Sequence, residues 1–204
     1  MTTEPTFRLA FLILLTGLIA MRVYFMVKVR QSGGRIMPDK QAVAREGGLV
    51  FFIFRVVVFF GLMAFLVMYS FGAVWIDVFL FPMPGLLRWM GFVLGIFTVA
   101  FWTWTQITLD TQWSAQLQLT KDHHLITTGP YAYVRHPLYV GVLGWCAALS
   151  LLTANWIFVA VCMLSIAMLV RRVPKEEQMM IESFKDEYIT YMQHTGRYFP
   201  RLRK

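Results

Sequence analysis

The chain has 204 residues, of which 58% are hydrophobic and 15% are charged, and its formal net charge is +8. A typical soluble domain has about 45–50% apolar and about 25% charged residues, so this composition excludes an ordinary soluble domain. The basic residues follow the ends of apolar segments, which argues against nucleic-acid binding and favours a lipid bilayer as the partner.

Five apolar segments are candidates for membrane helices, since a spanning helix needs roughly 20 mostly apolar residues. They lie at residues 7–29, 49–71, 86–108, 138–152 and 156–170. The last two arise from one long apolar run that is interrupted at Thr153-Ala154-Asn155, which predicts a helical hairpin. The first segment is too long for the apolar core of a cleaved signal peptide and is expected to be an anchor. The sequence therefore predicts an all-α integral membrane protein with five transmembrane helices.

Basic residues are distributed unequally between the two sides of these segments. Of the 19 lysines and arginines, 15 lie at the end of the first segment or after the first, third and fifth segments, and only Arg8 and Arg88 lie on the opposite side. Arg22 and Arg55 are placed where a long side chain reaches the nearer interface. Because cytoplasmic loops carry the excess of basic residues, we expect the amino terminus outside and the carboxyl terminus in the cytoplasm.

The polar run at residues 123–139 contains three of the four histidines, together with an arginine and three tyrosines. Gly129-Pro130 predicts a turn. His136-Pro137 predicts the start of a helix, because proline is favoured at the first helical position. The unpaired N–H groups of a helix start can bind an anion. This run therefore predicts an active site at the membrane surface.

After the fifth segment, Pro174 is expected to open another helix, with Glu176 and Glu177 in its first turn. Apolar residues then recur at helical spacing, namely Ile181, Phe184, Tyr188, Tyr191 and Met192. This pattern predicts an amphipathic helix on the cytoplasmic surface that folds over the end of the hairpin. Acidic residues in a first turn also stabilise the helix dipole, so a structural role for both glutamates is the alternative.

The composition divides the chain into an apolar three-helix scaffold, residues 1–107, and a region that carries nearly all the polar chemistry, residues 108–204. We expect the two parts to pack as one integrated domain. Cys146 and Cys162 fall in the two arms of the hairpin without metal-ligand spacing. They are expected to pack as small hydrophobic side chains, and no metal site is predicted.

Three ordered motifs lie in the carboxyl-terminal half of the chain. They are His123-x-Leu125-Ile126-Thr127-x-Gly129-x-Tyr131, Arg135-His136-Pro137-x-Tyr139 and Arg172-x-x-x-Glu176-Glu177. Together they resemble the isoprenylcysteine carboxyl methyltransferase family, and phospholipid N-methyltransferases share the same half. The resemblance covers roughly residues 105–200. It implies a membrane enzyme that transfers a methyl group from S-adenosylmethionine to a lipid-like or prenylated acceptor, most directly a prenylcysteine-type carboxylate.

The resemblance also implies roles for individual residues. Cofactor contacts are implied for Gln116, His123, His124, Leu125, Ile126, Gly129, Tyr131, His136, Pro137, Leu138, Tyr139, Glu176 and Glu177. Catalytic roles are implied for Arg172 and Glu176, with Arg172 beside the acceptor. Of the two adjacent histidines, His123 is favoured. The lipophilic acceptor is expected to enter laterally from the bilayer, and the short chain suggests the plasma membrane of a prokaryote.

The residue types suit this cofactor. A glutamate accepts hydrogen bonds from an ammonium group or ribose hydroxyls, and an imidazole or a helix start binds a carboxylate. The rings of Tyr131 and Tyr139 offer a face to a sulfonium. Structural alternatives stand beside these roles, because His136 is also placed to cap a helix and Arg135 is also placed to meet lipid phosphate.

Two other function classes stay open. Membrane sterol-type reductases that use NADPH resemble the same half of the chain, but they typically have asparagine where Leu138 stands. The third class is a non-catalytic scaffold or transporter. Against a transporter, the first three segments hold no intramembrane acid and no paired charges of the kind that mark a transport route.

Overall fold

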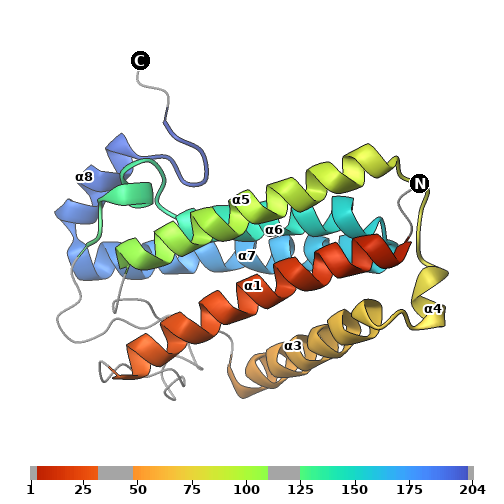
Figure 1. Cartoon of the computed structure of the whole chain (residues 1–204). Coiled ribbons are helices and arrows are strands. Elements are labelled where there is room, and N and C mark those ends of the chain that lie inside the picture. Colours follow the sequence, from red (N-terminus) through yellow and green to blue (C-terminus); the bar gives the residue numbers. More distant parts are fainter. Residues whose placement is uncertain (1–3, 32–47, 110–124, 202–204) are drawn as a thin grey trace.

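The structure is a computed structural model that describes residues 4–31, 48–109 and 125–201 (Figure 1). Its long helices are α1 (Glu4–Gln31), α3 (Gly48–Ser70), α5 (Gly85–Leu109), α6 (Pro137–Thr153) and α7 (Trp156–Phe184). The short elements are α4 (Val74–Asp77), the 3₁₀ helix η2 (Gly129–Ala132) and α8 (Asp186–His194). Within these described ranges the only β pairings are two isolated bridges, so the predicted all-α class is confirmed.

The five predicted apolar segments coincide with the five long helices, and apart from the end of α7 their bounds agree within three residues. Among the helices searched, α1, α5 and α7 are long and apolar enough to cross a membrane, and α6 is a shorter apolar helix of 17 residues. The chain is an integral membrane protein. The full count of five spans stays a prediction.

The prediction of a separate helix starting at Pro174 is wrong. Helix α7 continues through Pro174 to Phe184 without interruption. An interior proline removes one helical hydrogen bond, but Val173 and Glu177 on either side are buried, and this packing holds the helix together. The break comes instead at Lys185, where φ is +49°, and α8 follows. The predicted amphipathic helix is thus divided between the end of α7 and α8, and Glu176 and Glu177 lie in a helix interior rather than in a first turn.

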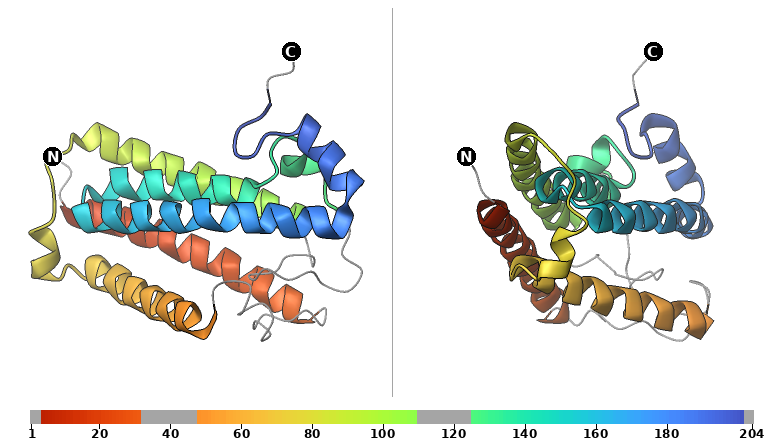
Figure 2. Two further views of the ribbon diagram at one scale, coloured as in Figure 1. Left: turned by 180° about the vertical axis from the view of Figure 1, so that it is seen from behind. Right: turned by 90° about the vertical axis from the view of Figure 1, so that its right-hand side faces the viewer.

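The predicted hairpin between α6 and α7 is present (Figure 2). Its turn is fixed by Asn155. Ala154 takes the left-handed conformation that ends α6. The Asn155 side-chain oxygen accepts from the Ile157 N–H at 2.9 Å and so caps the start of α7. Its amide nitrogen donates to the Ile76 carbonyl in α4 at 3.0 Å. The interruption in hydrophobicity therefore marks a capped turn.

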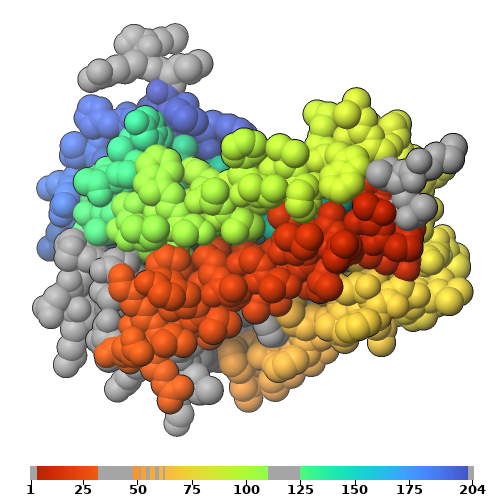
Figure 3. All heavy atoms as spheres, viewed as in Figure 1, coloured from red at the N-terminus to blue at the C-terminus, as the bar shows by residue number. Residues whose placement is uncertain are grey.

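Glycines bring α5 close to its neighbours. A Cβ on Gly91 would lie 2.7 Å from the Leu152 nitrogen in α6, and one on Gly95 would lie 2.5 Å from a methyl group of Leu14 in α1. Helices in a membrane associate through such small residues. In the space-filling view α1 and α5 lie side by side, and η2 and α8 gather at one end (Figure 3).

Charged pairs occur at the opposite end of the bundle, and their acids, Glu4 and Asp77, lie outside the predicted apolar segments, so the expectation of no transport-type charge pairs within those segments is not contradicted. Arg88, only 8% exposed, donates to Glu4 at 2.6 and 3.0 Å and to the Leu152 carbonyl at 2.9 Å. Arg8 pairs with Asp77. The two acids lie outside the predicted segments, so the sequence pattern did not reveal these pairs. They join α1, α4, α5 and the end of α6 at one edge of the bundle, and they do not form a route through it.

Candidate active site

Two stretches of the chain that are distant in sequence, residues 129–139 and 172–201, meet at the end of the bundle where α6 begins (Figure 1). They comprise η2, the start of α6, the polar last part of α7, and α8 with the tail after it. The tail pairs with the segment before α6 through backbone hydrogen bonds. Arg135 N–H donates to the Gly196 carbonyl at 2.8 Å, and His136 N–H donates to the Arg197 carbonyl at 3.2 Å. The polar run and the carboxyl-terminal residues therefore form one unit.

Glu176 is the centre of a first polar group, the Glu176 cluster, which comprises Tyr131, Tyr139, Arg172 and Glu176. The Tyr139 hydroxyl donates to Glu176 Oε2 at 2.5 Å, and Arg172 Nε lies 3.9 Å from the same oxygen. Burial raises the pKa of Tyr131, and the nearby charge of Glu176 raises that pKa further, which is why Tyr131 is included in the cluster. The side chains of Arg172 and Glu176 are 28% and 29% exposed, which leaves both accessible to a ligand.

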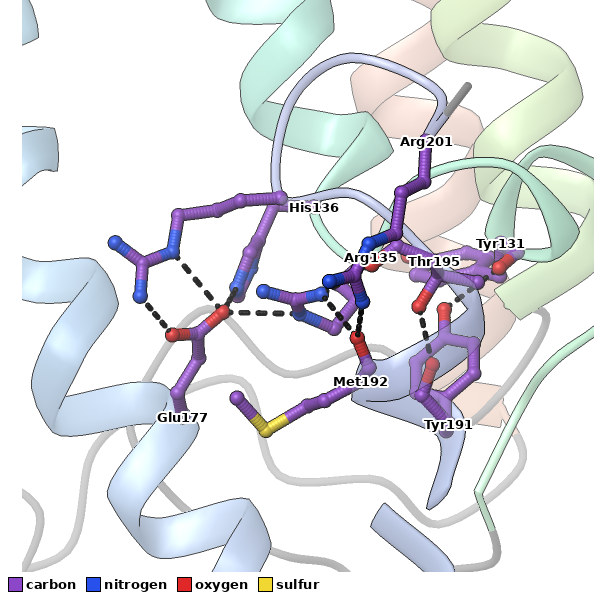
Figure 4. A network of polar contacts seen from close by, with 9 residues as sticks. Tyr131, Arg135, His136, Glu177, Tyr191, Met192, Thr195 and Arg201 are labelled. Atoms are coloured by element: carbon purple, nitrogen blue, oxygen red, sulfur yellow. Dashed lines mark hydrogen bonds and ion pairs between the residues drawn. The ribbon is translucent and has the colours of Figure 1, made fainter. Parts of the chain in front are cut away.

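Glu177 is the centre of a second group, the Glu177 cluster, which comprises Arg135, His136, Glu177 and Arg197. Figure 4 labels the first three of these residues. Glu177 is only 4% exposed. Its Oε1 accepts from Arg135 Nε at 3.1 Å and from Arg197 Nε at 3.2 Å, and it lies 3.3 Å from His136 Nε2. A second nitrogen of Arg197 donates to Oε2. A buried charge is tolerated only when it is paired and hydrogen-bonded, and here two guanidinium groups meet that condition.

His136 joins the two clusters. It occupies the N-cap position of α6 with Pro137 at the first helical position, as predicted, but its side chain makes no capping hydrogen bond. The imidazole instead meets Glu177 and stacks on the Tyr139 ring, with 5.4 Å between ring centroids and 18° between planes. The capping alternative for its side chain is therefore wrong, because the ring is used between two helices.

Helix α8 and the tail hold η2 and Arg135 in place. The Tyr191 hydroxyl donates to the Tyr131 carbonyl at 2.6 Å, and burial raises the pKa of Tyr191 to about 12. The Thr195 hydroxyl donates to the Tyr191 carbonyl at 2.6 Å. Arg135 donates to the carbonyls of Met192, at 3.3 Å, and of Thr195. The hydrogen bond to Glu177 raises the pKa of Arg197, which keeps this tail cation charged.

Gly129 is required by the conformation of the predicted turn. Its φ is +58°, and a Cβ there would lie 2.7 Å from Thr108 Oγ1 at the end of α5. Leu125, Ile126 and Leu138 are half-buried in the same region. These four predicted residues have no polar side-chain atoms, so their part in the site is to set the backbone path and the packing around it.

The outcomes for the predicted site residues differ. Tyr131, His136, Tyr139, Arg172, Glu176 and Glu177 are brought together. Gln116, His123 and His124 lie outside the described residues, so their roles stay predictions. Among the described residues no group of three or more His, Cys, Asp or Glu side chains is arranged to hold a metal ion. Cys146 and Cys162 are free and buried, as expected for packing residues.

Sequence reasoning missed Arg197, Tyr191 and Thr195 as parts of the site. Arg197 was counted only as one of many cytoplasmic cations, and Tyr191 only as part of an apolar face. One signal for a cation in the site was available. Glu176 and Glu177 are adjacent and are followed by apolar residues, and a glutamate that becomes buried needs a cation as its partner. That signal does not say which of the eight basic residues after the fifth segment supplies the charge.

Known proteins resemble the same part of the chain. Residues 89–182 match the model of the isoprenylcysteine carboxyl methyltransferase (ICMT) family. A protein-S-isoprenylcysteine O-methyltransferase of Schizosaccharomyces pombe is 39% identical over 74 residues, which are 35% of this chain and 30% of that protein. The cobalt-zinc-cadmium resistance protein CzcN of Cupriavidus metallidurans is 36% identical over 86 residues, which are 40% of this chain and 38% of that protein.

The fold also has a solved counterpart. A structure of the eukaryotic intramembrane Ras methyltransferase ICMT superposes with a TM-score of 0.50 at 24% identity, over 71% of this chain and 48% of that chain. At this identity the superposition supports the fold alone. The chain thus spans less than half the length of each of these three proteins.

Proposed function

We propose that this chain, whose residues 89–182 belong to the isoprenylcysteine carboxyl methyltransferase family, transfers a methyl group from S-adenosylmethionine to a lipophilic acceptor at the membrane surface. Family membership confirms the resemblance inferred from the three motifs. The observation that supports the activity best is the Glu176 cluster. Residues from η2, α6 and α7 converge there on one accessible carboxylate beside the start of an apolar helix.

The chemistry of the donors and acceptors fits S-adenosylmethionine, which supplies an electrophilic methyl group on a sulfonium. Glu176 would accept from its ammonium group or ribose hydroxyls, because an ionised carboxylate only accepts hydrogen bonds. The rings of Tyr131 and Tyr139 would offer a face to the sulfonium, a contact that contributes roughly 0.5–2 kcal/mol. Glu177 would not bind the cofactor directly, since its oxygens are occupied by protein donors.

Arg172 would bind the acceptor. Its side chain is 28% exposed one helical turn from Glu176, and a planar fork of donors suits a carboxylate. A carboxylate acceptor is already ionised at neutral pH, so its methylation needs no general base. The enzyme's contribution is then to align the donor with the acceptor, which can supply up to about 7–11 kcal/mol. A prenylcysteine-type carboxylate is the acceptor that best matches these properties and the name of the Schizosaccharomyces pombe relative.

A lipophilic acceptor would enter from the bilayer. The helices around the site expose large apolar side chains, including Trp104 and Ile107 near the end of α5 and Val170 in α7. In this proposal five helices span the membrane with the site on the cytoplasmic side, as the distribution of basic residues indicates. Residues 1–107 form the scaffold and residues 108–204 hold the cofactor, and the host membrane is the plasma membrane of a prokaryote.

The alternative acceptor is an amine, as in a phospholipid N-methyltransferase. An amine must lose a proton before or during methylation, so the site would then need a base. Glu176 is an accessible carboxylate beside Arg172, 3.9 Å from its Nε, and would be the candidate base. A carboxylate product and an amine product are separated by alkaline hydrolysis, which releases methanol from a methyl ester but not from a methylamine.

The test uses the purified chain in detergent. S-adenosylhomocysteine and NADPH are titrated separately, and then labelled S-adenosylmethionine is offered with a prenylated cysteine, a phospholipid or an amphipathic amine. We expect binding of S-adenosylhomocysteine and base-labile methylation of the prenylated cysteine. Binding of NADPH in its place would instead identify the reductase, and binding of neither would favour the scaffold or transporter.

A further inference from the structure

An unbroken series of contacts runs from the carboxyl-terminal tail to Arg172. Arg197 binds Glu177 through two nitrogens, and Glu177 meets the His136 imidazole. His136 stacks on Tyr139, whose hydroxyl donates to Glu176, and Glu176 lies beside Arg172. The first and last members of this series are both cations, and neither the motifs nor the sequence spacing connects them.

The two counter-charges of Glu177 are not equivalent. Arg135 is constrained by further hydrogen bonds to the carbonyls of Met192 and Thr195, so its guanidinium is shared. Arg197 engages both carboxylate oxygens of Glu177, and its side chain is 45% exposed. The tail side chain therefore determines whether both oxygens of this buried carboxylate are held or one turns toward water.

We propose that Arg197 and Glu177 are positioning residues of the methyltransferase site. Arg197 holds Glu177, Glu177 holds the His136 imidazole against Tyr139, and the stacked Tyr139 ring directs its hydroxyl to Glu176. Neither residue touches the cofactor in this arrangement. The inference rests on the proposed function, because its consequence is tighter cofactor binding by Glu176 and Tyr139.

The geometry allows Arg197 to be changed without loss of the fold. The tail is tied to the segment before α6 by backbone groups, through the Gly196 and Arg197 carbonyls. These hydrogen bonds do not depend on the Arg197 side chain. Arg201 provides a matched control, since it is also a tail arginine and, among the described residues, donates to the carbonyls of Met192, at 3.2 Å, and Gln193 rather than to Glu177.

The first measurement reports on His136 without requiring activity. Diethyl pyrocarbonate modifies accessible imidazoles, and the exposed His194 in the same molecule is the internal reference. His136 is buried, so we expect it to react far more slowly than His194 in the unaltered protein. R197Q should accelerate modification of His136 at least about fivefold, R197K should give a smaller increase because a lysine cannot engage both oxygens, and R201Q should give none.

The second measurement is the affinity for S-adenosylhomocysteine in a double-mutant cycle. We expect R197Q to weaken binding about tenfold in the unaltered background and less than twofold in the Y139F background. R201Q should change binding less than twofold in both. A merely structural role for Arg197 would give the same loss in both backgrounds, because residues that do not act through one another contribute additively.

The outcomes separate this inference from the function on which it rests. If the unaltered protein fails to bind S-adenosylhomocysteine, the proposed function and this role are both overturned. If it binds and R197Q binds equally well, or if His136 stays protected in R197Q, only the positioning role is overturned. Equal losses from R197Q with and without the Tyr139 hydroxyl would also overturn it.

Discussion

Replacing Glu176 by glutamine removes one negative charge from the Glu176 cluster and keeps the size of the side chain. The amide oxygen can still accept from the Tyr139 hydroxyl, but the attraction to Arg172 and to a cofactor ammonium group is lost. Hydrogen bonds to charged groups contribute about 1.5–3 kcal/mol. Because the side chain is 29% exposed and solvent screens its charge, we expect the lower half of that range, about 1.5–2 kcal/mol, or about 10- to 30-fold weaker binding.

Calorimetric titration of S-adenosylhomocysteine into detergent-solubilised protein measures this loss. The matched control is E182Q, because Glu182 lies on the same helix, is exposed, and bonds only Gln178 at 3.1 Å among the described residues. E182Q should bind within twofold of the unaltered protein. The reasoning is refuted if a folded E176Q variant binds as tightly as E182Q, since Glu176 would then make no contact with the cofactor.

Three further predictions concern the acceptor, the turn and the outer edge of the bundle. R172K should leave the affinity for S-adenosylhomocysteine within threefold and lower kcat at least about tenfold, because a lysine lacks the fork; a rise in the cofactor KM alone would contradict this. G129A should lower the thermal midpoint, because a positive φ costs an alanine about 1–2 kcal/mol and the new Cβ would clash with Thr108. Adding T108A should recover only the part of the loss that comes from the clash, and full recovery would show that the positive φ contributes no cost. R88L should destabilise the protein by about 1–3 kcal/mol, because Glu4, whose side chain is 23% exposed, loses its guanidinium partner and keeps the Tyr69 hydroxyl, while methylation per folded molecule persists; an unchanged unfolding transition would show that the pair is not structural.

The helices could be predicted from the sequence because their cause is local. Twenty apolar residues in lipid have to satisfy their backbone hydrogen bonds within the segment, so hydropathy alone locates α1, α3, α5 and the hairpin. The turn at Asn155 could also be predicted from the local sequence, since a polar capping residue interrupts an otherwise apolar run. The pairing of Tyr139 with Glu176 was accessible only through the motifs, which place the two residues 37 positions apart.

The rest depended on contacts that no local pattern encodes. Pro174 is a strong signal for a helix boundary, but the buried neighbours Val173 and Glu177 outweigh the cost of one missing hydrogen bond. Arg197 reaches Glu177 because the tail returns along residues 134–136, a path set by backbone pairing. The pairing of Arg88 with Glu4 joins residues 84 positions apart. Long-range pairing of charges has no periodicity, so sequence reasoning finds the charges and not their partners.

The most direct test of a shared cofactor site is ultraviolet cross-linking of methyl-labelled S-adenosylmethionine to the purified protein, followed by peptide mapping. We predict that label appears on peptides containing Tyr131 to Tyr139 and Arg172 to Glu177, and that excess S-adenosylhomocysteine abolishes it. Label confined to α1 or α3, or label that excess S-adenosylhomocysteine does not displace, would contradict the account.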